Sequence, residues 1–254
     1  MQKTIAVTDL DALLWHHNSE QTWEEFATRL MRRAPRNIYT AIGSDLHSAV
    51  QQAAHAKIVD GEVGDTIENI DGLIVDKFDM PKHPQLDLLP IANGALEVPV
   101  QYTVKYGEMD SVQLVGYIDV IDTRGELWEI KSTTKSSGWA ERYFNSYQWR
   151  AYALASRTTT PVHYAVFFLK YDRDTVETTR RVTVTDVTEL SVLPYERMAQ
   201  DVEQLALQFA QMMDNHLPAY WMRSDPAVKA TPLKDILRDP RQFLDADHMS
   251  GPGL

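Results

Sequence analysis

The sequence predicts an α/β protein in which a mixed β-sheet is flanked by α-helices. Three observations lead to this prediction. Two helical patterns come first, followed by strand patterns, a central helical pattern, further strands and a closing helix. The 254 residues are 44% hydrophobic and 24% charged, a globular composition that can bury a sizeable core. No repeat or low-complexity linker divides the sequence, so we expect one domain over residues 1–217, with N-terminal helices in 1–57, the core in 58–217 and an irregular tail over 218–254.

Helical spacing of apolar residues marks four segments. In "TWEEFATRLMRRA" the residues Trp23, Phe26, Leu30 and Met31 recur at the spacing of one helix face. The next three segments are "TAIGSDLHSAVQQAAHAKI", "GWAERYFNSYQWRAYALASR" and "PYERMAQDVEQLALQFAQMMDNH". We expect each to form one continuous helix.

Short β-rich runs broken by Gly and Pro predict the strands. They are "TIENI", "GLIVDKF", "ALEVPVQYTV", "VQLVGYIDVID", "ELWEIKS", "VHYAVFFLKY" and "TVETTRRVTV". Only "TRG" separates "VQLVGYIDVID" from "ELWEIKS", so these two runs should pair as an antiparallel hairpin.

Composition excludes several classes of site and location. The sequence contains no cysteine, which rules out disulfides, thiolate zinc sites and cysteine-ligated iron–sulfur clusters. No apolar stretch approaches the roughly 20 residues of a membrane-spanning helix. The N-terminus lacks the layout of a signal peptide, so we expect a cytoplasmic protein, in a bacterium or a phage-infected host.

The charge is unevenly distributed. The net charge is −11, yet residues 131–181 hold nine basic and four acidic residues, a balance of +5. A locally basic face could contact phosphates, while ordinary solvated helix and strand faces explain the same numbers.

A charged triplet lies in the predicted hairpin. Glu129 and Lys131 are two residues apart in one strand and therefore share a face, and the turn brings Asp119 of the neighbouring strand to that face. Two carboxylates beside an ammonium fit a divalent-metal site, because hard cations such as Mg²⁺ prefer oxygen ligands. The alternative is an exposed hairpin with a cross-strand salt bridge, which contributes little to stability.

Two helical pairs add to the triplet. Gly43 and His47 are four residues apart in one predicted helix, and Gln148 and Tyr152 are four apart in another. Imidazole is a ligand of Mn²⁺-like metals. Each pair alone is commonly ordinary helix surface, but their conjunction with the triplet in this order is rarer.

Together these residues resemble the PD-(D/E)xK nuclease superfamily, specifically its RecB-type and lambda-exonuclease-like branch. The family's four motifs read here, in order, as "GSDLH" (43–47), "GYID" (116–119), "EIK" (129–131) and "QWRAY" (148–152). The resemblance implies a restriction-endonuclease-like core and divalent-metal-dependent hydrolysis. Glu97 matches an acidic strand position often seen before the Asp strand, although an ordinary strand carboxylate is the simpler interpretation.

The resemblance also implies a role for each motif residue. The metal, Mg²⁺ or Mn²⁺, would be held by His47, Asp119, Glu129 and the main-chain carbonyl of Ile130. Lys131 would act on the attacking water, and Gln148 and Tyr152 would support the catalytic site. Relatives with a cysteine-bound iron–sulfur cluster are excluded by the composition.

A polar loop and the helix after it supply candidate DNA contacts. These residues are Lys135, Ser136, Ser137, Arg142 and Arg150. An ordinary polar turn that leads into a helix explains the same residues.

The predicted function is a metal-dependent DNA nuclease, with an exonuclease acting on double-stranded ends or single strands favoured by analogy. The alternatives are a structure-specific or restriction-like endonuclease, a catalytically silent nucleic-acid-binding or assembly subunit, and an interaction protein with coincidental motifs. A single-strand annealing protein or a recombinase is a partner by analogy. The sequence does not indicate an oligomeric state.

Overall fold

The computed structural model describes residues 3–35, 38, 41–44, 46–47, 66–68, 74–76, 94–106, 110–179 and 181–237. A mixed β-sheet flanked by helices is observed, as the sequence predicts. None of the helices within these ranges has the length and apolar character needed to cross a membrane.

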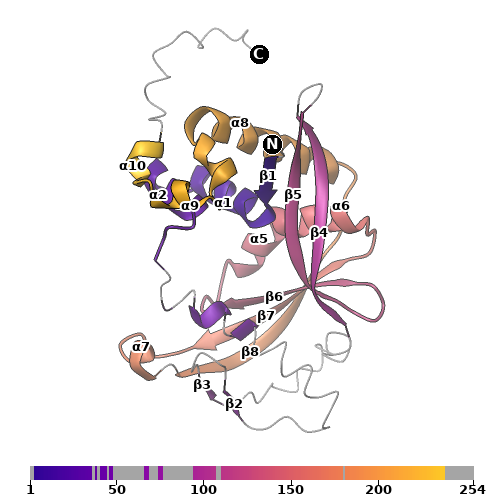
Figure 1. Cartoon of the computed structure of the whole chain (residues 1–254). Coiled ribbons are helices and arrows are strands. Elements are labelled where there is room, and N and C mark those ends of the chain that lie inside the picture. Colours follow the sequence, from indigo (N-terminus) through magenta and orange to yellow (C-terminus); the bar gives the residue numbers. More distant parts are fainter. Residues whose placement is uncertain are drawn as a thin grey trace. The chain divides into compact units, whose positions relative to one another are not determined.

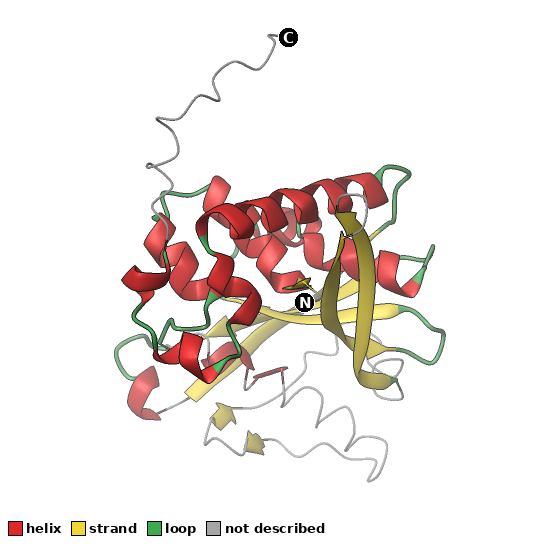
Figure 2. Ribbon diagram, turned by 45° about the horizontal axis from the view of Figure 1, so that its top comes forward, coloured by secondary structure: helices red, strands yellow, loops and turns green. Residues whose placement is uncertain are grey.

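Hydrogen bonds join the strands in the order β1-β5-β6-β7-β8-β3-β2, and β4 pairs with β5 (Figures 1 and 2). The strand bounds are β1 (Lys3–Ala6), β2 (Thr66–Glu68), β3 (Ile74–Asp76), β4 (Ala95–Tyr106), β5 (Asp110–Ile121), β6 (Leu127–Thr133), β7 (Val162–Lys170) and β8 (Arg181–Val192). The predicted hairpin is confirmed, because Val120 pairs with Trp128 and Ile121 with Leu127.

The helices with defined bounds are α1 (Val7–His17), α2 (Trp23–Leu30), α5 (Trp139–Phe144), α6 (Tyr147–Ser156), α7 (Val176–Thr179), α8 (Met198–His216), the 3-10 helix η1 (Pro218–Met222), α9 (Pro226–Ala230) and α10 (Leu233–Ile236). Residues 41–44 and 46–47 are also helical. The remainder of the helix predicted around them, from residue 48 onward, lies outside the described residues.

The chain forms two compact units. The first comprises Met1–Ala34, Tyr102–Val115 and Gln200–Leu254, and the second comprises Pro35–Gln101 and Gly116–Ala199. Each unit is built from segments that are separated in sequence. The single domain over residues 1–217 remains a prediction.

The second unit is organised around β6, β7 and β8. The strands β6 and β7 are parallel, with Glu129 opposite Tyr164 and Lys131 opposite Val166, and β7 and β8 are antiparallel. One face of these strands packs into an apolar cluster that includes Ile42 and Leu46. On the α5 side, Tyr143 stacks on Tyr164 with ring centroids 5.3 Å apart. The sheet is therefore covered on both faces, as a mixed sheet with parallel pairs requires.

The helix predicted over 138–157 is wrong in one respect, because it is broken into α5 and α6. Asn145 and Ser146 separate the two helices, and the Ser146 hydroxyl accepts a hydrogen bond from the Gln148 amide at 3.1 Å. Serine at this position satisfies an N–H that a new helix start would otherwise leave unpaired. The break lets α6 begin immediately before Gln148.

Two further expectations differ from the structure, and one strand and one helix were not expected. The strand expected over "TVETTRRVTV" begins as the helix α7 and becomes β8 only at Arg181. The segment from Pro218, expected to be irregular, contains η1, α9 and α10. Proline occupies an early position of η1 and α9, where its missing N–H has no helical partner to lose. The strand β1 was not predicted, because a four-residue strand gives little periodicity, and the helix α1 was not predicted either.

The first unit has a core of its own. The helix α2 begins with a capping box, in which Thr22 Oγ1 accepts from the Glu25 amide and Glu25 Oε2 accepts from the Thr22 amide. Phe26 and Leu30 follow on its buried face, and Phe209 of α8 is fully buried as well. β1 runs parallel to β5, with Lys3 opposite Val112 and Ala6 opposite Val115.

A buried carboxylate ties the N-terminal helices to the C-terminal segment. Asp9 Oδ2 accepts from the Tyr220 hydroxyl at 2.8 Å, and Asp9 Oδ1 lies 2.7 Å from Arg32 Nη2. Arg223 Nη2 lies 3.6 Å from Asp9 Oδ2. We expect Asp9→Ala to lower the free energy of unfolding by about 3 kcal/mol, because it leaves Tyr220, Arg32 and Arg223 without their buried partner. Urea unfolding measures this loss. Glu24→Ala, on the exposed side of α2, is the control with an expected change within about 0.5 kcal/mol; an equal effect of both changes would contradict the prediction.

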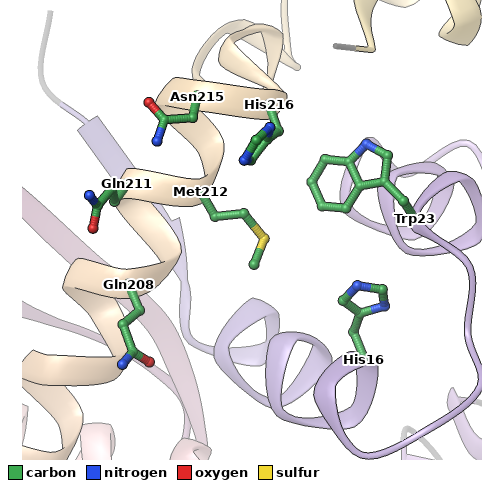
Figure 3. A pocket seen from close by; sticks show the side chains of 7 residues that line it. All are labelled: His16, Trp23, Gln208, Gln211, Met212, Asn215 and His216. Carbon is green, nitrogen blue, oxygen red and sulfur yellow. The ribbon is translucent and has the colours of Figure 1, made fainter. Parts of the chain in front are cut away.

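A pocket of about 400 Å³ opens in the first unit between α1, α2 and α8 (Figure 3). Its lining comprises His16, Trp23, Gln208, Gln211, Met212, Asn215 and His216. Burial lowers the pKa of His16 and of His216, and the neighbouring His17 lowers the pKa of His16 further. Both imidazoles are therefore neutral near pH 7, and none of the predicted catalytic residues lines the pocket.

Candidate metal centre

Asp119 and Glu129 both lie in the second unit, next to the pairs that join β5 to β6. The Val120–Trp128 pair fixes the register, and strand alternation then places Asp119 and Glu129 on the same face. The Ile130 amide donates a hydrogen bond to Asp119 Oδ2 at 2.7 Å. Asp119 is thus buried, and a main-chain amide of the neighbouring strand fixes its Oδ2. Its second oxygen, Oδ1, lies on the side of His47. The predicted role of the Ile130 carbonyl remains a prediction.

Lys131 is held between the two carboxylates. Its Nζ lies 2.6 Å from Glu129 Oε2 and 3.7 Å from Asp119 Oδ2. Burial alone would lower the pKa of Lys131, but the adjacent carboxylates of Glu129 and Asp119 raise that pKa well above its ordinary value. Lys131 is therefore a fixed ammonium whose side chain is only partly covered, and it can donate to a group that enters the site.

Glu129 is fully buried, and its two oxygens have different surroundings. Oε2 accepts from Lys131, whereas Oε1 has no hydrogen-bond partner among the described residues. Burial, reinforced by the charge of Asp119, raises the pKa of Glu129 to about 8, although Lys131 opposes this shift. A buried carboxylate oxygen without a partner is costly unless a cation or a proton satisfies it.

The side chains of His47, Glu97 and Asp119 converge on the side of Asp119 Oδ1. His47 Nε2 lies 3.2 Å from Glu97 Oε1 and 3.8 Å from Asp119 Oδ1. One ligand atom from each of the three residues lies within 4.8 Å of the other two. His47 and Asp119 are thus brought together as the sequence predicts. An imidazole and two carboxylates form a donor set that suits Mg²⁺ or Mn²⁺.

Glu97 is the residue that sequence reasoning undervalued. It lies in β4 with φ of +50°, a left-handed conformation that is rare for a non-glycine residue within a strand. Such backbone outliers occur where the surrounding structure holds a side chain in a special direction. Its side chain is 52% exposed and reaches His47. The acidic residue before the Asp strand was the only sequence signal for this position.

Gln148 and Tyr152 form the contact expected from their spacing. The Gln148 amide donates to the Tyr152 hydroxyl at 3.0 Å. Tyr152 is buried, and burial, together with the nearby Glu129, raises its pKa, so the phenol stays protonated. The Tyr152 ring packs on Gly116, where a Cβ atom would lie 2.7 Å from Tyr152 Cε1. The glycine of "GYID" is therefore explained by the close approach of α6 to β5.

The two motif glycines differ in the space that they require, and this gives a matched pair of variants. We expect Gly116→Ala to push Tyr152 aside, costing about 1–3 kcal/mol of stability, as overpacking does. At Gly43 the nearest atom to a new Cβ is Ser132 Oγ at 3.4 Å, an ordinary contact, so Gly43→Ala should be neutral or stabilising within its helix. Urea unfolding of both variants tests this. Equal destabilisation would contradict the assignment of Gly116 to the Tyr152 contact.

The five candidate DNA-contact residues have different environments. Lys135, Ser136, Ser137 and Arg142 are exposed, the first three in the loop between β6 and α5. Arg150 instead donates to the carbonyls of Asn145 and Phe144, and its guanidinium lies 4.6 Å from the Tyr147 ring centroid. Its guanidinium is thus engaged with the end of α5. Contact of these residues with DNA remains a prediction.

Comparison with known families accounts for this arrangement. The sequence model of the PD-(D/E)XK nuclease superfamily matches residues 25–224, which include every residue of the site. The chain belongs to this superfamily. Membership implies a nuclease that uses divalent metals and acts on nucleic acid. The match does not distinguish branches of the superfamily, so the RecB-type and lambda-exonuclease-like branch remains a prediction.

The remaining comparisons add little. No curated protein matches the chain. Among solved structures, the chain is similar to the one described as "Crystal structure of SSO0001", with 13% identity, a TM-score of 0.45 and coverage of 84% of this chain and 77% of that chain.

The residues present fit the divalent metal that the superfamily implies. The three ligand atoms of His47, Glu97 and Asp119 lie close enough to share one ion. Glu129, the other predicted carboxylate ligand, is not one of these three residues, although its buried Oε1 has no hydrogen-bond partner among the described residues. A nitrogen and several carboxylate oxygens are the ligands expected for Mg²⁺ or Mn²⁺.

The raised pKa of Glu129 predicts how metal binding depends on pH. Without metal, charging Glu129 is unfavourable in the fold, so its contribution to stability falls as pH rises from about 4.5 to about 8. A cation offsets this cost but competes with the proton at lower pH. We therefore expect the rise in melting temperature on adding Mg²⁺ to be larger at pH 8.5 than at pH 6.5. Thermal unfolding in Mg²⁺ and in EDTA measures it.

A variant separates Glu129 from the other residues of the site. Glu129→Gln keeps His47, Glu97 and Asp119 but removes the carboxyl whose pKa is raised. In this variant the rise in melting temperature on adding Mg²⁺ should differ less between pH 8.5 and pH 6.5 than it does in the native protein. An unchanged difference would contradict the assignment of the pH dependence to Glu129.

Proposed function

We propose that the protein is a Mg²⁺- or Mn²⁺-dependent deoxyribonuclease that acts as an exonuclease on DNA ends. The observation that carries the proposal is the convergence of Asp119, Glu129 and Lys131 beside His47 and Glu97. The preference for ends is supported by the resemblance of the four motifs to the RecB-type and lambda-exonuclease-like branch. The contacts of His47 with Asp119 and of Gln148 with Tyr152 agree with that motif order.

The metal would be held by His47, Glu97, Asp119 and Glu129. When bound, it would lower the pKa of a water and offset charge that develops on the phosphate. The chain's own residues fix the geometry of the site. The Ile130 amide fixes Asp119, and the Tyr152–Gln148 pair packs against Gly116 and so fixes the α6 side of the site.

Lys131 is placed to act on the reacting groups. Its ammonium, held by Glu129, can donate to the attacking water and to a phosphate oxygen as charge grows there. The water oxygen forms a bond to phosphorus, and the bond from phosphorus to the leaving sugar oxygen breaks. The water gives up a proton to solvent, and the leaving oxygen takes a proton from solvent to become a hydroxyl. No covalent enzyme intermediate is required, because water is the nucleophile.

The test compares end-labelled linear DNA with covalently closed circular DNA, in Mg²⁺, Mn²⁺ or EDTA. We expect metal-dependent loss of the linear DNA alone, and no loss with Asp119→Asn, which guards against a contaminating nuclease. Cutting of the circle would replace the exonuclease by an endonuclease. Stability of both DNAs in both metals would contradict the nuclease proposal.

Cellular context is part of the same proposal. We place the protein in the cytoplasm of a bacterium or a phage-infected cell, in recombination, repair or phage replication. A single-strand annealing protein or a recombinase that takes up the remaining strand is the matching partner class. Co-purification of such a protein with the nuclease would support it.

A further inference from the structure

We propose that Tyr143 of α5 is a positioning residue, whose hydroxyl holds the main chain beside Lys131 so that the ammonium stays between Glu129 and Asp119. This inference rests on the proposed function and deepens it by adding a residue that lies outside the four motifs. Tyr143 acts through Lys131 and not on the substrate itself.

The edge of β6 that faces β5 loses its strand partner beside Lys131. In the described part of these two strands, the pairing of β5 with β6 ends at Val120 and Trp128. Alternate residues of a strand direct their N–H and C=O groups to opposite edges. The Ile130 N–H and the Ser132 C=O therefore both point to the edge that β5 has left.

Two side chains take the place of the strand at this edge. Asp119 Oδ2 accepts from the Ile130 N–H at 2.7 Å, and the Tyr143 hydroxyl donates to the Ser132 C=O at 3.3 Å. Lys131 lies between Ile130 and Ser132, so its main chain is held on both sides. The second hydrogen bond is the longer and weaker of the two, and we expect its loss to have a moderate effect.

Tyr143 is itself held in place, because it is only 7% exposed and its ring stacks on Tyr164 of β7. Tyr164 is fully buried and lies opposite Glu129 in the register of β6 and β7, so the stacked pair covers the sheet face that carries Glu129 and Lys131. Burial raises the pKa of Tyr143, which keeps the phenol protonated and able to donate. Tyr143 thus joins α5 to both β6 and β7.

The position of the Lys131 ammonium depends on the main chain that carries it, because a lysine side chain is a flexible four-carbon stem. Without the Tyr143 hydroxyl, the Ser132 carbonyl is released and the main chain after Lys131 can shift. A small displacement of a group that acts on the reacting atoms lowers the rate of the chemical step. Binding of DNA and of metal does not depend on this hydroxyl.

The first measurement is steady-state cleavage by Tyr143→Phe, which keeps the stacked ring and removes the hydroxyl. We expect kcat to fall by about 3- to 10-fold, the range for one hydrogen bond, while KM and the half-saturating Mg²⁺ concentration change by less than about twofold. Tyr102→Phe is the control with a native kcat expected, because it removes a phenol hydroxyl that donates to Glu203 Oε1 at 2.7 Å. Thermal unfolding verifies that each variant folds.

The second measurement distinguishes positioning from general support of the fold. Adding Tyr143→Phe to Lys131→Ala should change the residual single-turnover rate by less than about twofold, because the side chain that Tyr143 positions is already absent. If Tyr143 only supported the fold, the same 3- to 10-fold loss would recur in the Lys131→Ala protein. That recurrence would overturn the proposal.

The third measurement does not depend on cleavage. In protein labelled with ¹³C-lysine, the NMR signal that disappears in Lys131→Ala belongs to Lys131. The two Hε protons of a lysine held in one arrangement have different chemical shifts, and these shifts merge when the side chain rotates. We expect two Hε shifts for Lys131 in the native protein and in Tyr102→Phe, and merged shifts in Tyr143→Phe.

The outcomes separate the positioning role from the nuclease proposal. If Tyr143→Phe changes neither kcat nor the Hε shifts while cleavage still requires Lys131, the positioning role is wrong and the nuclease stands. If the Hε shifts merge only in Tyr143→Phe but native protein cleaves no DNA in either metal, Tyr143 positions Lys131 and the nuclease proposal falls.

Discussion

Replacing Lys131 by alanine is expected to lower kcat by about 10²- to 10³-fold, the usual cost of removing one fixed donor that stabilises transition-state charge. The structure gives the reason, because Lys131 is the ammonium that Glu129 and Asp119 hold beside the predicted metal ligands. KM should change much less, since the loss concerns charge that develops only during the reaction. Initial rates of Mg²⁺-dependent cleavage, measured over a range of DNA concentrations, give both constants.

Lys135→Ala is the matched control for this prediction. Lys135 follows in the exposed loop after β6, so its removal takes away one positive charge without disturbing the carboxylates. A loss of kcat with Lys135→Ala equal to that with Lys131→Ala would mean that general charge, and not a positioned ammonium, matters. A native kcat in Lys131→Ala would remove Lys131 from the catalytic mechanism.

Replacing Glu97 by glutamine is expected to raise the Mg²⁺ concentration needed for half-maximal activity by about 10- to 100-fold or more. Losing a partner of a metal ligand already costs that much in affinity. The carboxylate of Glu97 lies 3.2 Å from His47 Nε2, and Glu97 is one of the three residues, with His47 and Asp119, whose ligand atoms converge. At saturating Mg²⁺ most of the activity should return, because Asp119, Glu129 and Lys131 remain. Activity as a function of Mg²⁺ concentration gives the result.

Glu196→Gln is the control for the Glu97 prediction, because Glu196 is an exposed carboxylate outside the metal cluster. Its metal dependence should match that of the native protein. If Glu97→Gln also matches the native protein, Glu97 is an ordinary strand carboxylate, as the simpler interpretation of the sequence had it.

Much of the site followed from the sequence because local geometry decides it. Alternation within strands and the three-residue turn "TRG" are enough to place Asp119 near Glu129 and Lys131. Spacing of four residues in a helix likewise predicts the contact between Gln148 and Tyr152. In each case the contact depends on one element or one hairpin.

The rest depends on features that periodicity does not reveal. The side chain of Glu97 reaches His47 from a residue with positive φ, and a strand pattern assumes regular φ throughout. Gly116 needs to be small because a ring from α6 packs on it, a contact 36 residues away in sequence. The break at Ser146 had a local signal, the capping serine, which the apolar periodicity on either side outweighed.

The central claim is that His47, Glu97 and Asp119 hold a divalent metal beside Lys131. The most direct measurement is an anomalous difference map from crystals of the protein soaked in Mn²⁺. We predict a peak within roughly 2.3 Å of His47 Nε2, Glu97 Oε1 and Asp119 Oδ1, the distance range for such ligands. Manganese bound only elsewhere, with these three side chains unliganded at saturating concentration, would contradict the claim.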